Sequence, residues 1–347
     1  MLSVHDLAQS QLGEALGYDK TYISLVERGR RRLDDLASRR HIAVRLRLPP
    51  HVLGITDPAD SDHRAMVQFG ASTIRLADIA RQNGHAADAV AELWPLVARW
   101  EARIADGHAE REVVRLLARA RVGLGVALGN VLPEERLPTA AHWTAKAVRL
   151  ARFTEDPTFT SYALRMHGNE LRKAGLHWAA VHRLRQAAAL ASDPRARAAV
   201  LPLLVRAAGE LGDSQLFDTA ISEAEALVDT VNHTSLVNPA ALYEIRLRGL
   251  ISTGRTVAAV GLLGPPASTT AAPQWRVIEA VTVGQVQLVA GDRSGAAHSL
   301  RSAAAEAARQ RRPHQLQRIV RVSRHTLPEV SDTAGEQVRL LKEEMTA

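Results

Sequence analysis

The sequence contains no cysteine, few aromatic residues and no long uncharged apolar run. Without cysteine the chain can form no disulfide, no thiolate nucleophile and no cysteine-ligated zinc or iron–sulfur site. Aromatic residues are 4% of the chain, and its valines and isoleucines do not follow the alternation typical of strands. No segment reaches the roughly 18 uncharged apolar residues that a membrane-spanning helix needs. We therefore expect an all-α, cytoplasmic protein without a membrane partner.

The motifs of common enzyme classes are also missing. The sequence has no GxxxxGK[ST] phosphate loop, no HExxH pair and no GxSxG nucleophile motif. Its histidines are scattered, and even His177 and His182 do not have the i, i+4 spacing of a helical metal pair. We expect no enzyme activity, no cofactor and no metal site.

What the sequence does have is helix-forming residues and positive charge. Ala, Leu and Arg dominate, which favours helix throughout. The formal net charge is +7, and residues 1–55 carry a net positive balance of their own, which permits attraction to nucleic acid. A chain of 347 residues is too long for one ordinary core, so we expect several domains or an extended repeat array.

Near the N-terminus the pattern predicts two short helices joined by a tight turn. Residues 7–16 have helical periodicity, and Gly17 suits the left-handed end of that helix. Asp19 is placed to cap a second helix over residues 20–28, which Gly29 ends.

The second of these helices has an apolar and a polar face. Ile23 and Val26 are expected to face inward, and three arginines follow directly after the helix. The outward residues are Lys20, Thr21, Ser24 and Leu25.

The stretch QSQLGEALGYDKTYISLVERGRR, residues 9–31, resembles the helix-turn-helix of the Xre family of phage-repressor and Cro-like proteins, and LPPHVLGI at residues 48–55 resembles that family's closing segment. The matching residues are Gln9, Leu12, Leu16, Gly17, Ile23, Ser24, Glu27 and Gly29. The resemblance implies that the second helix docks in the major groove of double-stranded DNA.

The resemblance assigns base contacts to Lys20, Thr21 and Ser24, and phosphate contacts to Gln9 and Arg28. Charge adds Arg30 and Arg31, which follow the helix end where the DNA backbone should pass. Leu25 either meets a thymine methyl group or packs against a neighbouring helix. The alternative for the polar residues is an ordinary solvated helix face.

In that family a further helix precedes the matched stretch, whereas only a few residues lie upstream here. We therefore expect a truncated domain that lacks this first helix. Three explanations stay open: a start codon placed too far downstream, a helix supplied by a partner, or a fragment that has lost DNA binding.

After residue 60 the sequence repeats a spacing of small residues that resembles tetratricopeptide repeats. The aligned sets are Ala77, Gly84 and Ala89; Gly168, Gly175, Ala180 and Ala187; and Gly284, Gly291, Ala296 and Ala303. We expect five or six helix pairs stacked into an α-solenoid with a concave surface. The predicted boundaries are 1–56 for the helix-turn-helix, 57–64 for a linker, 65–325 for the array and 326–347 for a C-terminal helix.

The groove of such an array is expected to hold a peptide or protein signal. Asn169 can hydrogen-bond a peptide backbone, and Arg172 and Arg183 can hold a carboxylate, unless the three are ordinary exposed residues. The sequence therefore predicts a DNA-binding transcriptional regulator, acting as a homodimer. The alternatives are an interaction scaffold with a vestigial helix-turn-helix and, less favoured, an RNA-binding array.

Overall fold

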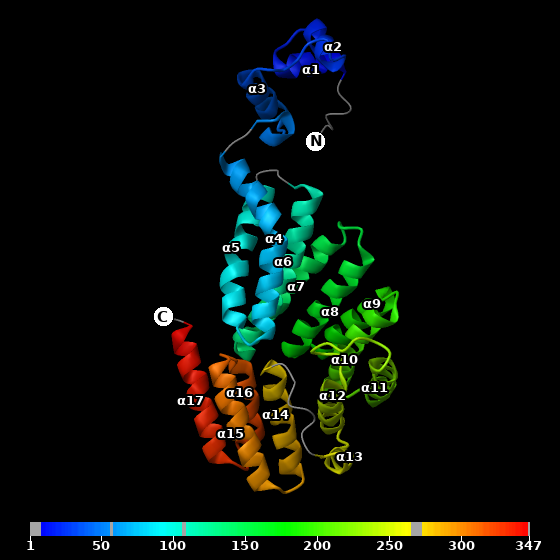
Figure 1. Cartoon of the computed structure of the whole chain (residues 1–347), viewed down its shortest axis with the longest axis vertical. Helices are drawn as coiled ribbons and strands as arrows, with labels where there is room; N and C mark the ends of the chain where they lie inside the picture. The colour runs from blue at the N-terminus through cyan, green and yellow to red at the C-terminus, as the bar shows by residue number, and fades with distance from the viewer. Residues whose placement is uncertain (1–7, 56–57, 106–108, 265–272, 346–347) are drawn as a thin grey trace. The chain divides into compact units, whose positions relative to one another are not determined.

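The computed structural model describes residues 8–55, 58–105, 109–264 and 273–345. Over these ranges the protein is all-α, with seventeen α-helices, two short 3-10 helices and no strand, as the sequence predicts (Figure 1). The chain forms two compact units, Met1–Ala71 with Ala98–Val113 and Ser72–Val97 with Val114–Ala347.

The first unit begins with three short helices around a small apolar core. They are α1 (Gln9–Leu16), α2 (Lys20–Glu27) and α3 (Leu36–Leu46), followed by the 3-10 helix η2 (Pro50–Leu53). Leu16, Ile23 and Ile42, one from each helix, form the buried core. Ile23 is buried as predicted, while Val26 is only partly buried.

The turn between α1 and α2 follows from a few residues. Gly17 takes a left-handed φ of 72°, and the Asp19 carboxylate accepts a hydrogen bond of 2.7 Å from the Tyr22 backbone N–H. A Cβ atom on Gly13 would lie 2.6 Å from the Tyr18 carbonyl oxygen, so only glycine lets the turn fold back this closely. The predicted helix–turn–helix geometry is therefore present, and the residues upstream of Ala8 lie outside the described ranges.

The remaining helices form the array, and three of them, α4, α5 and α6, contribute residues to both units. Their bounds are α4 (Pro58–Gln82), α5 (Ala86–Ala105), α6 (Arg111–Val131), η3 (Glu134–Arg136), α7 (Leu137–Ala151), α8 (Pro157–Lys173), α9 (His177–Leu190), α10 (Pro194–Leu211), α11 (Ser214–Val228), α12 (Pro239–Ser252), α13 (Thr256–Gly261), α14 (Pro273–Val289), α15 (Arg293–Arg309), α16 (Pro313–Ser323) and α17 (Pro328–Glu344).

In the second unit consecutive helices pack as pairs, from α8 with α9 to α16 with α17. The first helices of successive pairs also touch one another, α8 with α10, α10 with α12, α12 with α14 and α14 with α16. We call α4, α6, α8, α10, α12, α14 and α16 the inner row. Among the described residues, helix contacts establish five pairs, from α8 with α9 to α16 with α17, in agreement with the five or six predicted.

Two of the predicted boundaries read differently in the structure. The expected linker at 57–64 is helical from residue 58, where α4 begins with a proline, a residue that suits the first position of a helix. The expected C-terminal helix at 326–347 corresponds to α17, which completes a pair with α16.

The repeated glycines allow the two helices of a pair to pack closely. A Cβ atom on Gly168 would lie 2.6 Å from Leu184 Cγ, and one on Gly284 would lie 2.7 Å from Leu300 Cγ. The same contact recurs in two repeats because the two segments place glycine and leucine sixteen residues apart. Glycines with a left-handed φ lie in the turns after α4, α8, α10, α12 and α14. They are Gly84, Gly175, Gly212, Gly254 and Gly291.

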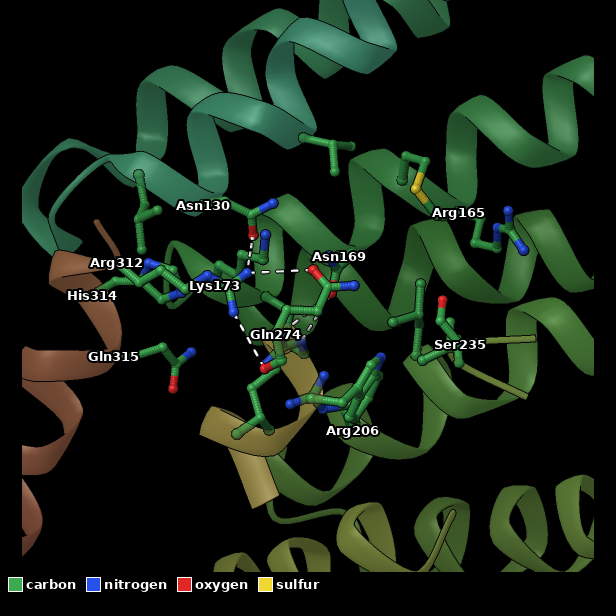
Figure 2. A pocket seen from close by; sticks show the side chains of 18 of the residues that line it. Asn130, Arg165, Asn169, Lys173, Arg206, Ser235, Gln274, Arg312, His314 and Gln315 are labelled. Atoms are coloured by element: carbon green, nitrogen blue, oxygen red, sulfur yellow. Dashed lines mark hydrogen bonds between the residues drawn. The ribbon is translucent and has the colours of Figure 1, made fainter. Parts of the chain in front are cut away.

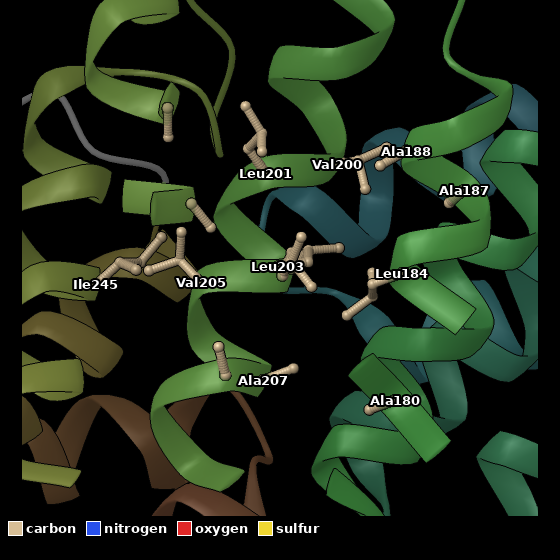
Figure 3. Packing of buried hydrophobic residues seen from close by; sticks show 14 of the residues in the cluster. Ala180, Leu184, Ala187, Ala188, Val200, Leu201, Leu203, Val205, Ala207 and Ile245 are labelled. Atoms are coloured by element: carbon tan, nitrogen blue, oxygen red, sulfur yellow. The ribbon is translucent and has the colours of Figure 1, made fainter. Parts of the chain in front are cut away.

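Alanines and branched side chains fill the core of the array. Figure 3 shows Ala180, Leu184 and Ala187 along α9, and Val205 of α10 beside Ile245 of α12. Small residues let the helix backbones approach closely. The buried side chains group into clusters, and α14 contributes to two of them. Among the described helices, none has the length and apolar character that crossing a bilayer requires.

The last pair of the array packs against η3, which connects α6 and α7. The Glu134 backbone N–H donates a 2.8 Å hydrogen bond to Gln317 Oε1, and the Glu134 carboxylate pairs with Arg321 at 2.5 Å. Glu135 pairs with Lys342 of α17 and accepts a 2.9 Å hydrogen bond from Gln317 Nε2, and these two interactions lower the pKa of Glu135 to about 2. We call these interactions the closing contact, because they join the last helix pair to the segment between α6 and α7.

Candidate functional site

The helix predicted to read DNA presents its polar side chains to solvent. Lys20 and Thr21 are exposed at the start of α2, and Ser24 is partly buried one turn later. Residues at these positions share one face of a helix. Leu25 is also partly buried, so both of its predicted roles remain compatible with its position.

The predicted phosphate-contacting residues lie at the start of α1 and directly after α2. Arg28, Arg30 and Arg31 are exposed after α2, with the Arg31 guanidinium 4.6 Å from the centre of the Tyr22 ring. Gln9 Nε2 donates a 2.6 Å hydrogen bond to the Glu27 carboxylate. This bond ties the start of α1 to the end of α2 and fixes the Gln9 side chain beside the basic segment.

The second unit contains a cavity of about 970 Å³ that is lined mainly by the inner row. Every helix of the row contributes to its wall, from Asp78 and Arg81 of α4 to Arg318 of α16. Figure 2 shows Arg312, His314 and Gln315 on one side of the cavity and Arg165 and Ser235 on the other. Cavities of this size hold small organic ligands.

The wall of the cavity is strongly basic. Nine Lys and Arg residues line it against three Asp and Glu residues. Four of the arginines are buried, at 3–7% exposure: Arg172, Arg206, Arg312 and Arg318. Buried guanidinium groups are costly unless they are paired, so the positions of the carboxylates are informative.

One carboxylate, Glu210 of α10, pairs with two of these cations. Its Oε1 accepts a 2.7 Å hydrogen bond from Arg172 and lies 2.6 Å from Arg248 Nη2. Burial alone would raise the pKa of Glu210, but the charges of Arg172 and Arg248 outweigh burial and lower the pKa to about 2. Glu210 is therefore ionised at neutral pH and already shared between two cations.

A second carboxylate, Glu244 of α12, lies beside Arg206 and Arg318. Arg318 Nη2 donates to Thr282 Oγ1 at 2.8 Å, and the Thr282 hydroxyl donates to Glu244 Oε1 at 2.6 Å. Arg206 Nη2 lies 4.0 Å from Glu244 Oε2, which is too long for a hydrogen bond. Among the described residues, Arg206 Nε, Arg318 Nη1 and Glu244 Oε2 have no hydrogen-bond partner.

Two further cations complete this part of the wall. Lys173 Nζ donates to the Gly129 carbonyl at 3.2 Å and to Glu170 Oε1 at 2.9 Å. Arg312 Nη2 donates to Asn130 Oδ1 at 3.0 Å. Burial lowers the pKa of Lys173 to about 8 and that of Arg312 to about 10.

The structure brings together two of the three residues predicted for the groove. Asn169 and Arg172 line the cavity, where Asn169 Oδ1 accepts a 3.2 Å hydrogen bond from Arg172 Nη2. Arg183 does not line it: it belongs to α9, outside the inner row, and donates to Gln186 Oε1 at 2.9 Å. Among the lining residues, α9 contributes only His177 at its first position, and Arg183 lies further along that helix.

Of the nine cations in the wall only Arg172 is predicted from the sequence; the others are Arg81, Arg165, Lys173, Arg206, Arg248, Arg312, Arg318 and Arg321. One signal was available: Arg206 interrupts the apolar run LPLLV–RAAG of α10, a position where a charged side chain must be buried. Similarly, Arg318 precedes Ile319 and Val320 in α16. Arginine inside an apolar stretch of a helix therefore marks this site better than the exposed arginines do.

Comparison with known proteins adds little to this picture. No protein-family model matches the chain, and no curated protein matches it. One solved structure with some likeness is described as a circular tandem repeat protein with novel repeat topology and enhanced subunit contact surfaces. It is 13% identical, with 97% of this chain and 83% of that chain covered and a TM-score of 0.20. The interpretation of this chain therefore depends on its own residues and geometry.

Proposed function

We propose that the chain is a sequence-specific, DNA-binding transcriptional regulator of the Xre-like type, whose helical array binds a signal ligand. The observation that supports DNA binding is the first helix pair, in which a capped, glycine-stopped turn presents Lys20 and Thr21 on α2. Exposed arginines follow directly after that helix. Polar side chains on an exposed helix can contact base edges, and cations at the end of that helix can contact the flanking phosphates.

The regulator is proposed to act in the cytoplasm as a homodimer on paired half-sites. A single helix-turn-helix buries a small interface with DNA, so two copies are needed for high affinity. The spacing of the half-sites on DNA would then report the separation of the two recognition helices.

The signal is proposed to bind in the cavity of the inner row. Asn169 and Arg172, the two predicted peptide-binding residues found there, offer an amide and a guanidinium to a ligand. A peptide is one ligand that such groups can hold. The distribution of charge around the cavity narrows the chemical class of the ligand further.

The test of DNA recognition is a genome-wide pull-down of DNA with the purified full-length protein at physiological salt. The triple variant Lys20→Ala/Thr21→Ala/Ser24→Ala is expected to enrich none of the discrete DNA sites that the wild-type protein enriches. An Arg28→Ala/Arg30→Ala/Arg31→Ala variant is expected to weaken binding to all sequences and to reduce its dependence on salt.

The matched control is Arg185→Ala/Arg195→Ala/Arg276→Ala, which removes three exposed arginines of the array and is expected to leave the sites unchanged. If the folded wild-type protein enriches no site above background, DNA recognition by this chain is excluded. The interaction scaffold then becomes the better interpretation.

A further inference from the structure

The cations deep in the cavity outnumber the carboxylates that neutralise them. Six cations form this part of the wall: Arg172, Lys173, Arg206, Arg248, Arg312 and Arg318. Three carboxylates are placed among them: Glu170, Glu210 and Glu244. Even with all three ionised, an excess of three positive charges remains. An unpaired excess of this kind is unfavourable in a buried site.

The excess charge is concentrated rather than spread along the cavity. Arg206 and Arg318 both lie beside Glu244, and Arg172 and Arg248 share one oxygen of Glu210. Burial, with the neighbouring charge of Arg172, lowers the pKa of Arg206 to about 9. Two guanidinium N–H groups, Arg206 Nε and Arg318 Nη1, have no hydrogen-bond partner among the described residues, although both side chains line the cavity and are 7% exposed.

Beside these cations the cavity offers an apolar and aromatic wall. Trp275 of α14 lies under the Arg206 guanidinium, 5.3 Å from it, and Leu203 and Ile278 line the same space. A ligand that fits both features has one compact, multiply charged end and one uncharged part of modest size. A peptide with carboxylates spaced along its backbone matches a concentrated charge less well.

We propose that the cavity binds a phosphate-bearing small molecule, with its phosphate groups held by Arg206 and Arg318 and its uncharged part against Trp275. Guanidinium groups bind phosphate with paired, charge-assisted hydrogen bonds, and several arginines converging from different helices suit a tetrahedral anion. A ligand carrying two or three negative charges would neutralise the excess. The inference rests on the ligand-binding half of the proposed function and does not depend on DNA binding.

The experiment is isothermal titration calorimetry of the full-length protein at physiological salt with defined probes. The phosphate probes are inorganic phosphate, pyrophosphate, AMP and ATP, and the competing probes are citrate and a short acidic peptide. Pyrophosphate or a nucleotide should bind most tightly, and the two nucleotides separate recognition of phosphate alone from recognition of an attached ring.

Arg206→Gln and Arg318→Gln should each weaken binding of the best phosphate probe about 10- to 100-fold, because each removes a charge-assisted hydrogen bond. The apo melting temperature of Arg206→Gln should stay the same or rise, since the substitution removes an uncompensated buried charge. Arg183→Gln, outside the cavity, is the matched control and should bind like wild type. Arg206→Lys, which keeps the charge but not the planar donor fork, should lose affinity as well and serves if the glutamine variant does not fold.

The inference is overturned if no phosphate probe binds wild type, if the acidic peptide or citrate binds more tightly than every phosphate probe, or if Arg183→Gln loses as much affinity as Arg206→Gln. Failure of the DNA pull-down with intact phosphate binding would remove the proposed regulator and leave this site. Enrichment of DNA sites without binding of any phosphate probe would support the regulator and exclude this ligand.

Discussion

At the scale of single residues, the tightest constraints in the array are glycines where helices cross. Gly284 of α14 has no room for a side chain, because a Cβ atom there would lie 2.7 Å from Leu300 Cγ and 2.9 Å from Leu300 Cδ2. A Cβ atom on Gly335 of α17, in contrast, would meet no heavy atom of the described residues within 4 Å. The two glycines are both helical and differ in what surrounds them.

Gly284→Ala is therefore expected to lower the free energy of unfolding by about 1–3 kcal/mol, since an overpacked helix crossing must separate. Gly335→Ala is expected to raise it by about 0.5–1 kcal/mol, because alanine loses less backbone entropy in a helix. Chemical denaturation of the two variants and the wild-type protein measures both changes in the free energy of unfolding. Equal effects of the same sign would contradict the packing of α14 against α15.

The second residue-scale prediction concerns the pH dependence of Glu210. Its pKa is about 2 in the folded protein, below the ordinary value of 4.5, because the charges of Arg172 and Arg248 outweigh the effect of burial. The stability that the ionised carboxylate contributes is therefore fully present above pH 4.5 and is lost as the pH falls from 4.5 to 2. Its size is up to about 3 kcal/mol, by linkage of the pKa shift to folding.

The difference in unfolding free energy between wild type and Glu210→Gln should accordingly be largest above pH 5 and shrink towards pH 2. Denaturant titrations across that range measure the difference, with Glu92→Gln on the exposed face of α5 as the control. A difference that does not vary with pH would show that Glu210 acts through packing and not through its charge.

At the scale of elements, the closing contact is a set of exposed pairs between η3 and the last helix pair. Glu134 and Arg321 have side-chain exposures of 34% and 56%, and pairs of this kind contribute about 0.2–1 kcal/mol. A double-mutant cycle of Glu134→Ala and Arg321→Ala should give a coupling energy in this range, which should fall in 1 M salt because exposed charges are screened. A coupling unaffected by salt would mean that the contact is apolar packing.

Sequence patterns predicted the elements better than the site. The left-handed glycines Gly84, Gly175 and Gly291 and the aspartate cap at Asp19 are local signals, so the helices they end or begin could be located. Which helix of a pair faces the cavity is decided by stacking between pairs. For that reason the sequence predicts both Arg172 and Arg183 in the groove, although Arg183 lies on the second helix of the pair and outside the cavity.

At the scale of the second unit, the closing contact distinguishes this array from an open one. In an open repeat array each pair contacts only its neighbours, and the terminal pairs open at the lowest free energy. Here the terminal pair has partners at both faces, α15 on one side and η3 on the other. Amide hydrogen exchange should therefore find α16 protected to a degree similar to α10.

In the Arg321→Glu variant, protection of α16 should fall while that of α10 stays unchanged, because only the terminal pair loses a partner. Mass spectrometry of peptides covering the two helices resolves this difference. Early exchange of α16 in the wild-type protein would show that the closing contact adds nothing to the stability of the last pair.

The closing contact also bears on how the protein is made. The Glu134 backbone and the Gln317 side chain that it meets are 183 residues apart in the chain. The ribosome must therefore synthesise α16 before the cavity has all of its walls, and the arginines at 312 and 318 emerge among the last. A chain cut short by a premature stop before this helix would lack Arg312 and Arg318 from the cavity wall, so only nearly full-length copies could form the complete proposed ligand site.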